Sequence, residues 1–256
     1  MTDITQPTID RALTTIERER KYLESEREAF RALLGRLSDI QPDAEPDPIA
    51  GSRGGTTTVS MTMTAPTQSR NLREAREAYR ETVMAVPHYE SEYDDSLEEN
   101  LTIECGPSLA RRLIVGDDLT PATYSAFVNA CKRAREERQR TLQLLERERD
   151  SLQRFASALD AIERDVIEEG TTIESVADTG TLSETDDRLR ALESQCEDLA
   201  TDRQEQIHER SKTDVDGLEL GFLEYLYGDL ETMTPVLSDL TDCLETIHYY
   251  RLRCLR

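Results

Sequence analysis

Residues 121–169 decide the fold: they read PATYSAFVNACKRAREERQRTLQLLERERDSLQRFASALDAIERDVIEE, with no glycine and with no proline after Pro121. Apolar or small side chains recur at alternating steps of three and four, and most positions between them are charged. This spacing is typical of a helix that packs along one narrow stripe, which we call a seam. At 1.5 Å per residue, the predicted helix is about 73 Å long. Its seam consists of Phe127, Cys131, Ala134, Arg138, Thr141, Leu145, Glu148, Leu152, Phe155, Leu159, Ile162 and Val166.

The N-terminal region carries a second seam, in residues 9–37. Two arginines, Arg20 and Arg27, occupy seam positions among the apolar side chains. We favour packing of their methylene stems, with the guanidinium groups in water. The alternative is a contact with a carboxylate on a partner helix that sets the register. The full seam is Ile9, Leu13, Ile16, Arg20, Leu23, Arg27, Phe30, Leu34 and Leu37.

The C-terminal region contains two more predicted helices after a break at 170–180. Thr181-x-x-Glu184 has the spacing of a capping box, and Thr234-Pro235 is a helix start with proline at the first helical position. The seams are Leu189, Leu192, Cys196, Leu199 and Arg203 in the first helix, and Val236, Leu240, Cys243, Ile247, Tyr250 and Cys254 in the second.

Shorter helices are predicted before the long one. The pattern indicates a helix over 71–86 that Pro87 stops, and another at about 94–104. Gly106 would end that helix and Pro107 would start the next one, which ends near Gly116.

Together these patterns predict an all-α fold: an elongated, coiled-coil-like bundle with one long central helix and shorter helices packed along it. Residues 39–70 are rich in Pro, Gly and Thr and predict a disordered linker. The predicted organisation is an N-terminal amphipathic helix (1–38), this linker (39–70), a helical region (71–169) with the long helix at about 121–169, and a C-terminal helical region (170–256). The residues expected to form an interaction seam are Leu23, Phe30, Leu34, Leu145, Leu152, Phe155, Leu159, Leu192, Leu199, Leu240 and Ile247.

The charge balance indicates a saline habitat. There are 53 acidic and 31 basic residues, a formal net charge of −22, and only three of the basic residues are lysines. At roughly 1 M salt the Debye length falls to about 3 Å, so an acidic surface repels itself little. We therefore predict a halophilic protein. Its negative charge then indicates adaptation to salt and says little about a binding partner. Arginine clusters at 111–112, 132–140 and 251–256 keep nucleic acid open as a partner, although a solvated helix face is the preferred interpretation of the middle one.

The cysteines and the hydropathy pattern favour the cytoplasm. Five cysteines, an odd number without a CxxC pair, do not suggest a disulfide framework. No secretion signal is recognised at the N-terminus, and no apolar run approaches the length of a membrane span. Most of the cysteines are expected to be small buried hydrophobes. Cys254, near Arg251 and Arg253, would have a lowered thiolate pKa if it were exposed.

Two ExxH motifs are weak metal candidates. Glu205-x-x-His208 and Glu245-x-x-His248 resemble the ligand pairs of carboxylate-bridged di-iron bundles. The seams, however, place all four residues on the outer sides of their helices. His88, within PHYESEYDD, is a third candidate, for which a solvated loop packed by neighbouring tyrosines is the preferred interpretation. We expect no cofactor, and no nucleotide-binding or nucleophile motif is recognised.

Several strings resemble a haloarchaeal family of helical proteins of unknown function. They are AYRETVMAVPHYESEYDDSLEENL (78–101), ECGPSLARRL (104–113), LTPATYSAFVNACKRAREERQRTLQLLERERDSL (119–152) and EYLYGDLETMTPVL (224–237). The resemblance implies a helical fold and a halophilic source, and it implies no activity, cofactor or partner.

The functional prediction is therefore a non-enzymatic, cytoplasmic helical scaffold or protein-interaction protein, which binds a protein partner or a second copy of itself through its seams. The alternatives are a nucleic-acid-associated regulator that uses the arginine clusters and an ExxH-type metal-binding bundle.

Overall fold

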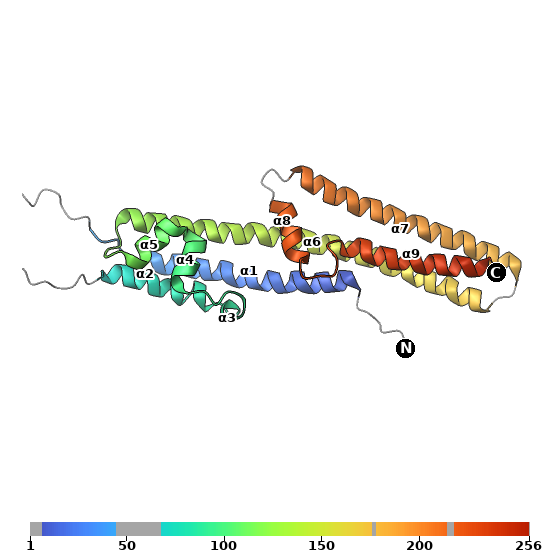
Figure 1. Cartoon of the computed structure of the whole chain (residues 1–256), viewed down its shortest axis with the longest axis horizontal. Helices are drawn as coiled ribbons and strands as arrows, with labels where there is room; N and C mark the ends of the chain where they lie inside the picture. Colours follow the sequence, from blue (N-terminus) through green and yellow to red (C-terminus); the bar gives the residue numbers. More distant parts are fainter. Residues whose placement is uncertain (1–6, 45–67, 176–177, 214–217, 256) are drawn as a thin grey trace, which may run out of the picture. The chain divides into compact units, whose positions relative to one another are not determined.

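The structure, a computed structural model, describes residues 7–44, 68–175, 178–213 and 218–255, and these ranges contain helices and no strand (Figure 1). The predicted all-α fold with one long helix is confirmed. The elements are α1 (Thr8–Ser38), α2 (Arg70–Arg80), the 3₁₀ turn η1 (Val83–Ala85), α3 (Tyr89–Glu92), α4 (Leu97–Cys105), α5 (Pro107–Val115), α6 (Pro121–Ser175), α7 (Thr179–Thr213), α8 (Leu218–Tyr227) and α9 (Pro235–Cys254).

The chain divides into two compact units. One comprises residues 21–142, and the other comprises residues 1–20 and 143–256. Both boundaries fall inside helices, α1 and α6, whereas the sequence suggested breaks at 38, 70 and 170. A boundary inside a continuous helix leaves no composition change for a sequence pattern to detect.

The unit of residues 21–142 packs α2, α4 and α5 against parts of α1 and α6. Its core is apolar and well enclosed, with Phe30 of α1, Tyr79 of α2 and Phe127 of α6 almost fully buried. Gly106 joins α4 to α5 with a φ of 83°, a conformation that favours glycine. The predicted Gly–Pro junction is therefore present, and Ser96 begins α4 with a capping box that includes Glu99.

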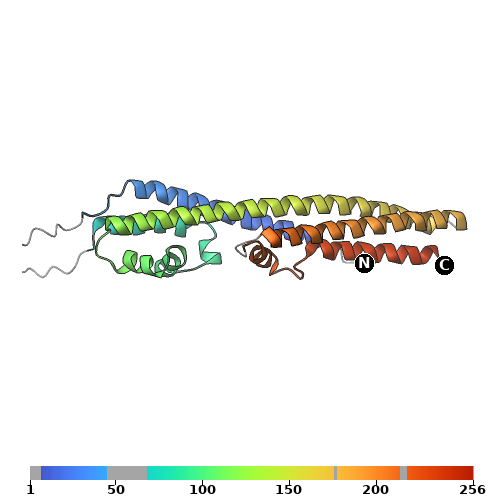
Figure 2. The same ribbon diagram turned by 90° about the horizontal axis from the view of Figure 1, so that it is seen from above.

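The other unit is built from α6, α7 and α9, whose helices lie side by side in both views (Figures 1 and 2). The α6 seam is turned inward along the whole of this unit. Its buried members are Leu145, Glu148, Leu152, Phe155, Leu159, Ile162 and Val166. Asp239 of α9 accepts hydrogen bonds from the first backbone N–H groups of α1, those of Thr8 (2.9 Å) and Ile9 (2.8 Å). A carboxylate at a helix N-terminus satisfies donors that have no partner within the helix.

The long helix continues beyond its predicted end at 169 and stops within the predicted break of 170–180. It ends at Ser175 and includes Gly170. A Cβ atom at Gly170 would lie 2.4 Å from Cζ of Tyr250, so the glycine makes room for this ring of α9. The residue that resembles a helix breaker therefore serves close helix packing instead.

The first helix after the linker is shorter than predicted. α2 ends at Arg80, and a 3₁₀ turn of three residues follows before Pro87. The hydroxyl of Thr82 donates to the carbonyl oxygen of Ala78 at 2.6 Å. Such a side-chain bond competes with the helical backbone and favours an early end.

The inner face of α1 is rotated from the predicted one. Glu19 and Glu26 are buried, whereas Arg20 and Arg27, one residue later, are only half-buried. Arg20 pairs with Glu17 on its own helix, and Arg27 donates to the side chain of Gln139 on α6. The rotation has a physical cause, because both buried carboxylates accept hydrogen bonds from other elements. Glu19 accepts one from the Tyr225 hydroxyl of α8 at 2.6 Å, and the partners of Glu26 are described below.

The ends of the predicted linker are ordered. Ile40 is buried, and Asp43 exchanges two hydrogen bonds with the backbone of Leu119: Asp43 N–H donates at 2.8 Å, and Leu119 N–H donates to Oδ2 at 2.7 Å. The side chain of Asn71 donates to Oδ1 at 2.6 Å. Disorder is thus incorrect for these flanking residues, and 45–67 lie outside the described residues.

Replacing Asp43 with Ala is expected to lower the free energy of unfolding by about 1–3 kcal/mol, because charge-assisted hydrogen bonds are lost. Hydrogen bonds, foremost that from the Ser69 hydroxyl, lower the pKa of Asp43 below its ordinary value of 3.8. A lowered pKa gives stability that is complete above 3.8 and is lost as the pH falls through the folded-state pKa. Urea unfolding at pH 7 and pH 3 should therefore show a smaller difference between wild type and D43A at pH 3; an unchanged difference would contradict this.

Candidate functional site

The unit of residues 21–142 contains a buried polar cluster centred on Glu26. His88 Nε2 lies 2.9 Å from Glu26 Oε1, and the Tyr93 hydroxyl donates to the same oxygen at 2.8 Å. The Glu26 and His88 side chains are 7% and 4% exposed. Tyr22 stacks on the His88 ring, with ring centroids 4.2 Å apart. The cluster therefore ties α1 to the turn that begins α3.

Arg138 of α6 completes this cluster. Its Nε donates to Glu26 Oε2 at 3.0 Å, and its two terminal nitrogens donate to both carboxylate oxygens of Glu104 on α4. Burial alone would lower the pKa of Arg138, but the hydrogen bonds and charges of Glu104 and Glu26 outweigh it and raise the pKa. The guanidinium group also lies over the Phe30 ring, 5.1 Å from its centroid. One arginine thus holds two carboxylates from two helices.

The other unit contains a second buried ion pair, between Glu148 of α6 and Arg203 of α7. Arg203 Nη2 donates to Glu148 Oε1 at 2.6 Å. The Arg203 side chain is 2% exposed, and the Glu148 side chain is 0% exposed. The Tyr227 hydroxyl of α8 donates to the same Glu148 oxygen at 2.5 Å. Arg203 also donates to Ser151 Oγ at 3.1 Å. Three helices therefore meet at one carboxylate.

These two clusters have the character of structural joints. In each of them carboxylate oxygens accept several hydrogen bonds, and the charges are largely removed from water. Reactive groups in enzymes need access to a substrate. The chemistry that the clusters support directly is the fixing of helices in one register, for which buried polar groups are well suited.

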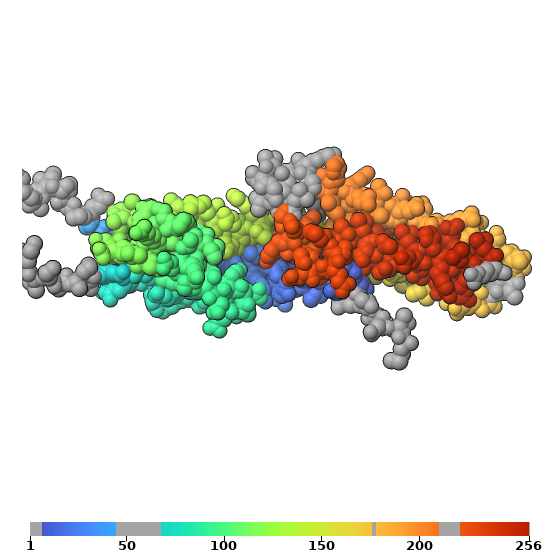
Figure 3. All heavy atoms as spheres, viewed as in Figure 1, coloured from blue at the N-terminus to red at the C-terminus, as the bar shows by residue number. Residues whose placement is uncertain are grey.

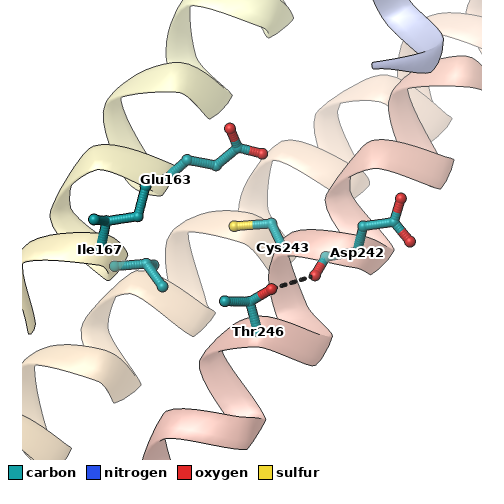
Figure 4. A pocket seen from close by; sticks show the side chains of 6 residues that line it. Glu163, Ile167, Asp242, Cys243 and Thr246 are labelled. Carbon is teal, nitrogen blue, oxygen red and sulfur yellow. Dashed lines mark hydrogen bonds between the residues drawn. The ribbon is translucent and has the colours of Figure 1, made fainter. Parts of the chain in front are cut away.

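Hollows in the described part of the chain include one in each unit. One, of about 340 Å³, is a charged surface hollow in residues 21–142, lined by Arg27, Glu28, Arg31, Arg135, Glu136 and Gln139. The other, of about 190 Å³, lies between α6 and α9 and is shown in Figure 4; it is lined by Glu163, Val166, Ile167, Asp242, Cys243 and Thr246. The second brings a thiol together with carboxylates, and burial raises the pKa of Glu163 there.

Comparison with known families gives one match, which covers both units. The family described as a domain of unknown function, DUF7260, matches residues 7–251. The chain belongs to this family. No curated protein and no solved structure matches the chain. This membership agrees with the predicted resemblance to a family of unknown function, and it assigns no function to the clusters and hollows described above.

The ExxH candidates are far from a metal-binding arrangement. Glu205, His208, Glu245 and His248 are all exposed. His248 Nε2 lies 2.6 Å from Glu193 Oε1 of α7, in a surface pair. Among the residues that the structure describes, no group of three or more His, Cys, Asp and Glu side chains is placed to hold a metal ion. Membrane-spanning character is also missing from every helix in the described ranges.

His88 differs most from its preferred interpretation. It is 5% exposed and bonded to Glu26, rather than part of a solvated loop. The error has a simple cause: the partner lies 62 residues earlier, in a helix whose sequence is a run of charges. Cys254 is half-buried, so the condition under which a lowered pKa was expected, an exposed thiol, is not met, and burial raises its pKa.

The predicted interaction seam is largely occupied within the chain. Of its residues, the buried ones are Phe30, Leu145, Leu152, Phe155, Leu159, Leu192, Leu240 and Ile247, and the half-buried ones are Leu23, Leu34 and Leu199. The chain's own helices therefore cover most of the apolar surface that the sequence offered to a partner.

The arginine clusters are partly engaged as well. Arg138 binds two carboxylates, Arg251 binds Asp186 and Glu193, and Arg253 binds Glu174. Guanidinium groups that already bind carboxylates are less available to phosphates. The sequence pattern missed this, since it shows the arginines of a cluster but not the acidic residues that face them.

Proposed function

We propose that the chain is a non-enzymatic, cytoplasmic helical scaffold that binds another helical protein or a second copy of itself. The support is that most apolar side chains of the seams are buried within the chain, whereas a few other apolar side chains are exposed. The seams are used within the chain, so they build the framework. The buried ion pairs hold its helices in register. A partner would then bind apolar side chains that remain outside.

The C-terminal end of α9 and the residue after it carry such side chains, and this is the observation on which the proposal rests. Tyr249, Leu252 and Leu255 are 58%, 60% and 75% exposed. The outer face of α9 lies on the surface in Figure 3. Isolated exposed apolar residues are common on proteins, but three within seven residues of one helix end form a small contact face. An amphipathic helix of a partner could lay its apolar side on this face.

The double variant L252E/L255E tests the proposal. Burying two leucines is worth roughly 1.5–3 kcal/mol each, so the variant should bind its partner at least about tenfold more weakly. Its unfolding should change little because both side chains are exposed. Self-association would be measured by sedimentation in concentrated KCl, and partner binding by quantitative cross-linking in extracts of the native host.

A matched control is Ile103→Glu, which changes an equally exposed apolar residue (71%) on α4. This variant should associate as the wild type does. Wild type that stays monomeric and cross-links to no protein would remove the proposal, and equal binding by L252E/L255E would remove the assignment of this face.

A further inference from the structure

Two cysteines from different helices face each other inside the unit that contains α7 and α9. The sulfur atoms of Cys196 and Cys243 lie 3.9 Å apart. Both side chains are buried, with 0% and 3% of their surface exposed. Each belongs to its own seam, 47 residues apart in sequence. Their seam positions account for both cysteines as buried packing residues. The same positions also place the two thiols in direct contact.

The separation is short enough for a bond to form. A disulfide needs sulfur atoms about 2.05 Å apart, so the pair must close by roughly 2 Å. Rotation about the two Cα–Cβ bonds and a small shift of α9 against α7 can supply that movement. Ion pairs of Arg251 with Asp186 and Glu193 already hold these two helices together nearby.

The pair also has a route to small molecules. Cys243 lines the hollow of about 190 Å³ between α6 and α9, and Figure 4 shows its sulfur pointing from α9 into this space. A volume of this size holds several waters, and hydrogen peroxide is little larger than water. Glu163 and Asp242 make part of the lining polar, which suits such a molecule.

The two thiols differ in acidity. The hydrogen bond between them lowers the pKa of Cys196, and the same bond, together with burial, raises the pKa of Cys243. The shared hydrogen bond therefore makes the two thiols inequivalent, with the lower pKa at Cys196. By contrast, burial raises the pKa of Cys105 to about 12 and also raises that of Cys131.

We propose that Cys196 and Cys243 form a redox-active dithiol that a peroxide converts to a disulfide between α7 and α9. The sulfur that meets the peroxide first attacks one oxygen, the O–O bond breaks, and a sulfenic acid and one water (or alcohol) are formed. The second sulfur then attacks the first, the S–O bond breaks and a second water leaves. The two thiols lose two electrons and two protons in total, and the peroxide accepts them.

The test uses the full folded chain in concentrated KCl, treated with graded hydrogen peroxide, then alkylated and analysed by peptide mass spectrometry. The expected product is a monomeric chain with a peptide pair linked between Cys196 and Cys243 and lighter by two hydrogen atoms. Dithiothreitol should remove the link. Cys105 and Cys131 serve as internal controls that stay alkylated at the same dose.

Variants sharpen the result. Oxidised wild type should melt at a higher temperature than reduced wild type, and dithiothreitol should remove this rise. Cys196→Ala and Cys243→Ala should each abolish both the link and the rise. Cys131→Ala, a matched buried thiol in the other unit, should keep both. Failure of the linked peptide to form in folded wild type, its formation between chains, or single-cysteine oxidation in its place would each overturn the proposal, whether or not the variants fold.

Discussion

Replacing Arg203 with Met is expected to lower the free energy of unfolding by about 3–5 kcal/mol, a large share of the stability of a typical domain. The guanidinium group is 2% exposed and donates to Glu148, which is fully buried. Met fills a similar volume but supplies no charge and no donor. Glu148 would keep the hydrogen bond from Tyr227, yet its charge would lose the opposite charge beside it.

Urea unfolding followed by circular dichroism measures this effect. Arg190→Met is the matched control on the same helix, because Arg190 is 57% exposed and its partner Asp186 keeps its other ion pair, with Arg251. The double variant E148Q/R203M should recover most of the loss, since Gln is neutral and can still accept from Tyr227. A loss below 1 kcal/mol in R203M would show that the pair does not hold α6 to α7.

The positions of the helices could be predicted wherever the signal is local. Thr234-Pro235 and Gly106-Pro107 act through the backbone of a few residues, and both junctions lie where the sequence places them. The α6 seam could also be predicted, because its period repeats over twelve positions. It included Glu148, a charged residue at a seam position, and this was the sequence signal for the buried ion pair.

The buried clusters could not be predicted in full, because their partners are distant in sequence. Glu26 stands among charged neighbours on α1 and looks like part of a solvated face. Only the approach of His88 and Arg138 from other elements makes its burial favourable. Gly170 is a similar case: its role depends on the ring of Tyr250, 80 residues later. Local patterns carry no information on such contacts.

Arg138→Met in the other unit should be comparably costly, at about 3–5 kcal/mol. Arg138 is the cation that Glu26 and Glu104 share, and its side chain is 17% exposed. Without it, two carboxylates with 7% and 11% exposure are left close together. Repulsion between like charges then adds to the cost of holding them away from water.

A double-mutant cycle separates these terms. Glu104→Gln in the R138M background removes one of the two negative charges, so E104Q/R138M should be more stable than R138M, although E104Q alone should be less stable than wild type. Arg31→Met is the matched control, since Arg31 is 70% exposed and pairs with Glu28 on the same helix. If E104Q destabilises R138M as much as it destabilises the wild type, Glu104 and Arg138 act independently and the cluster does not work as a unit. If the sign reverses as expected, the buried charges of Glu104 on α4 and Arg138 on α6 are coupled.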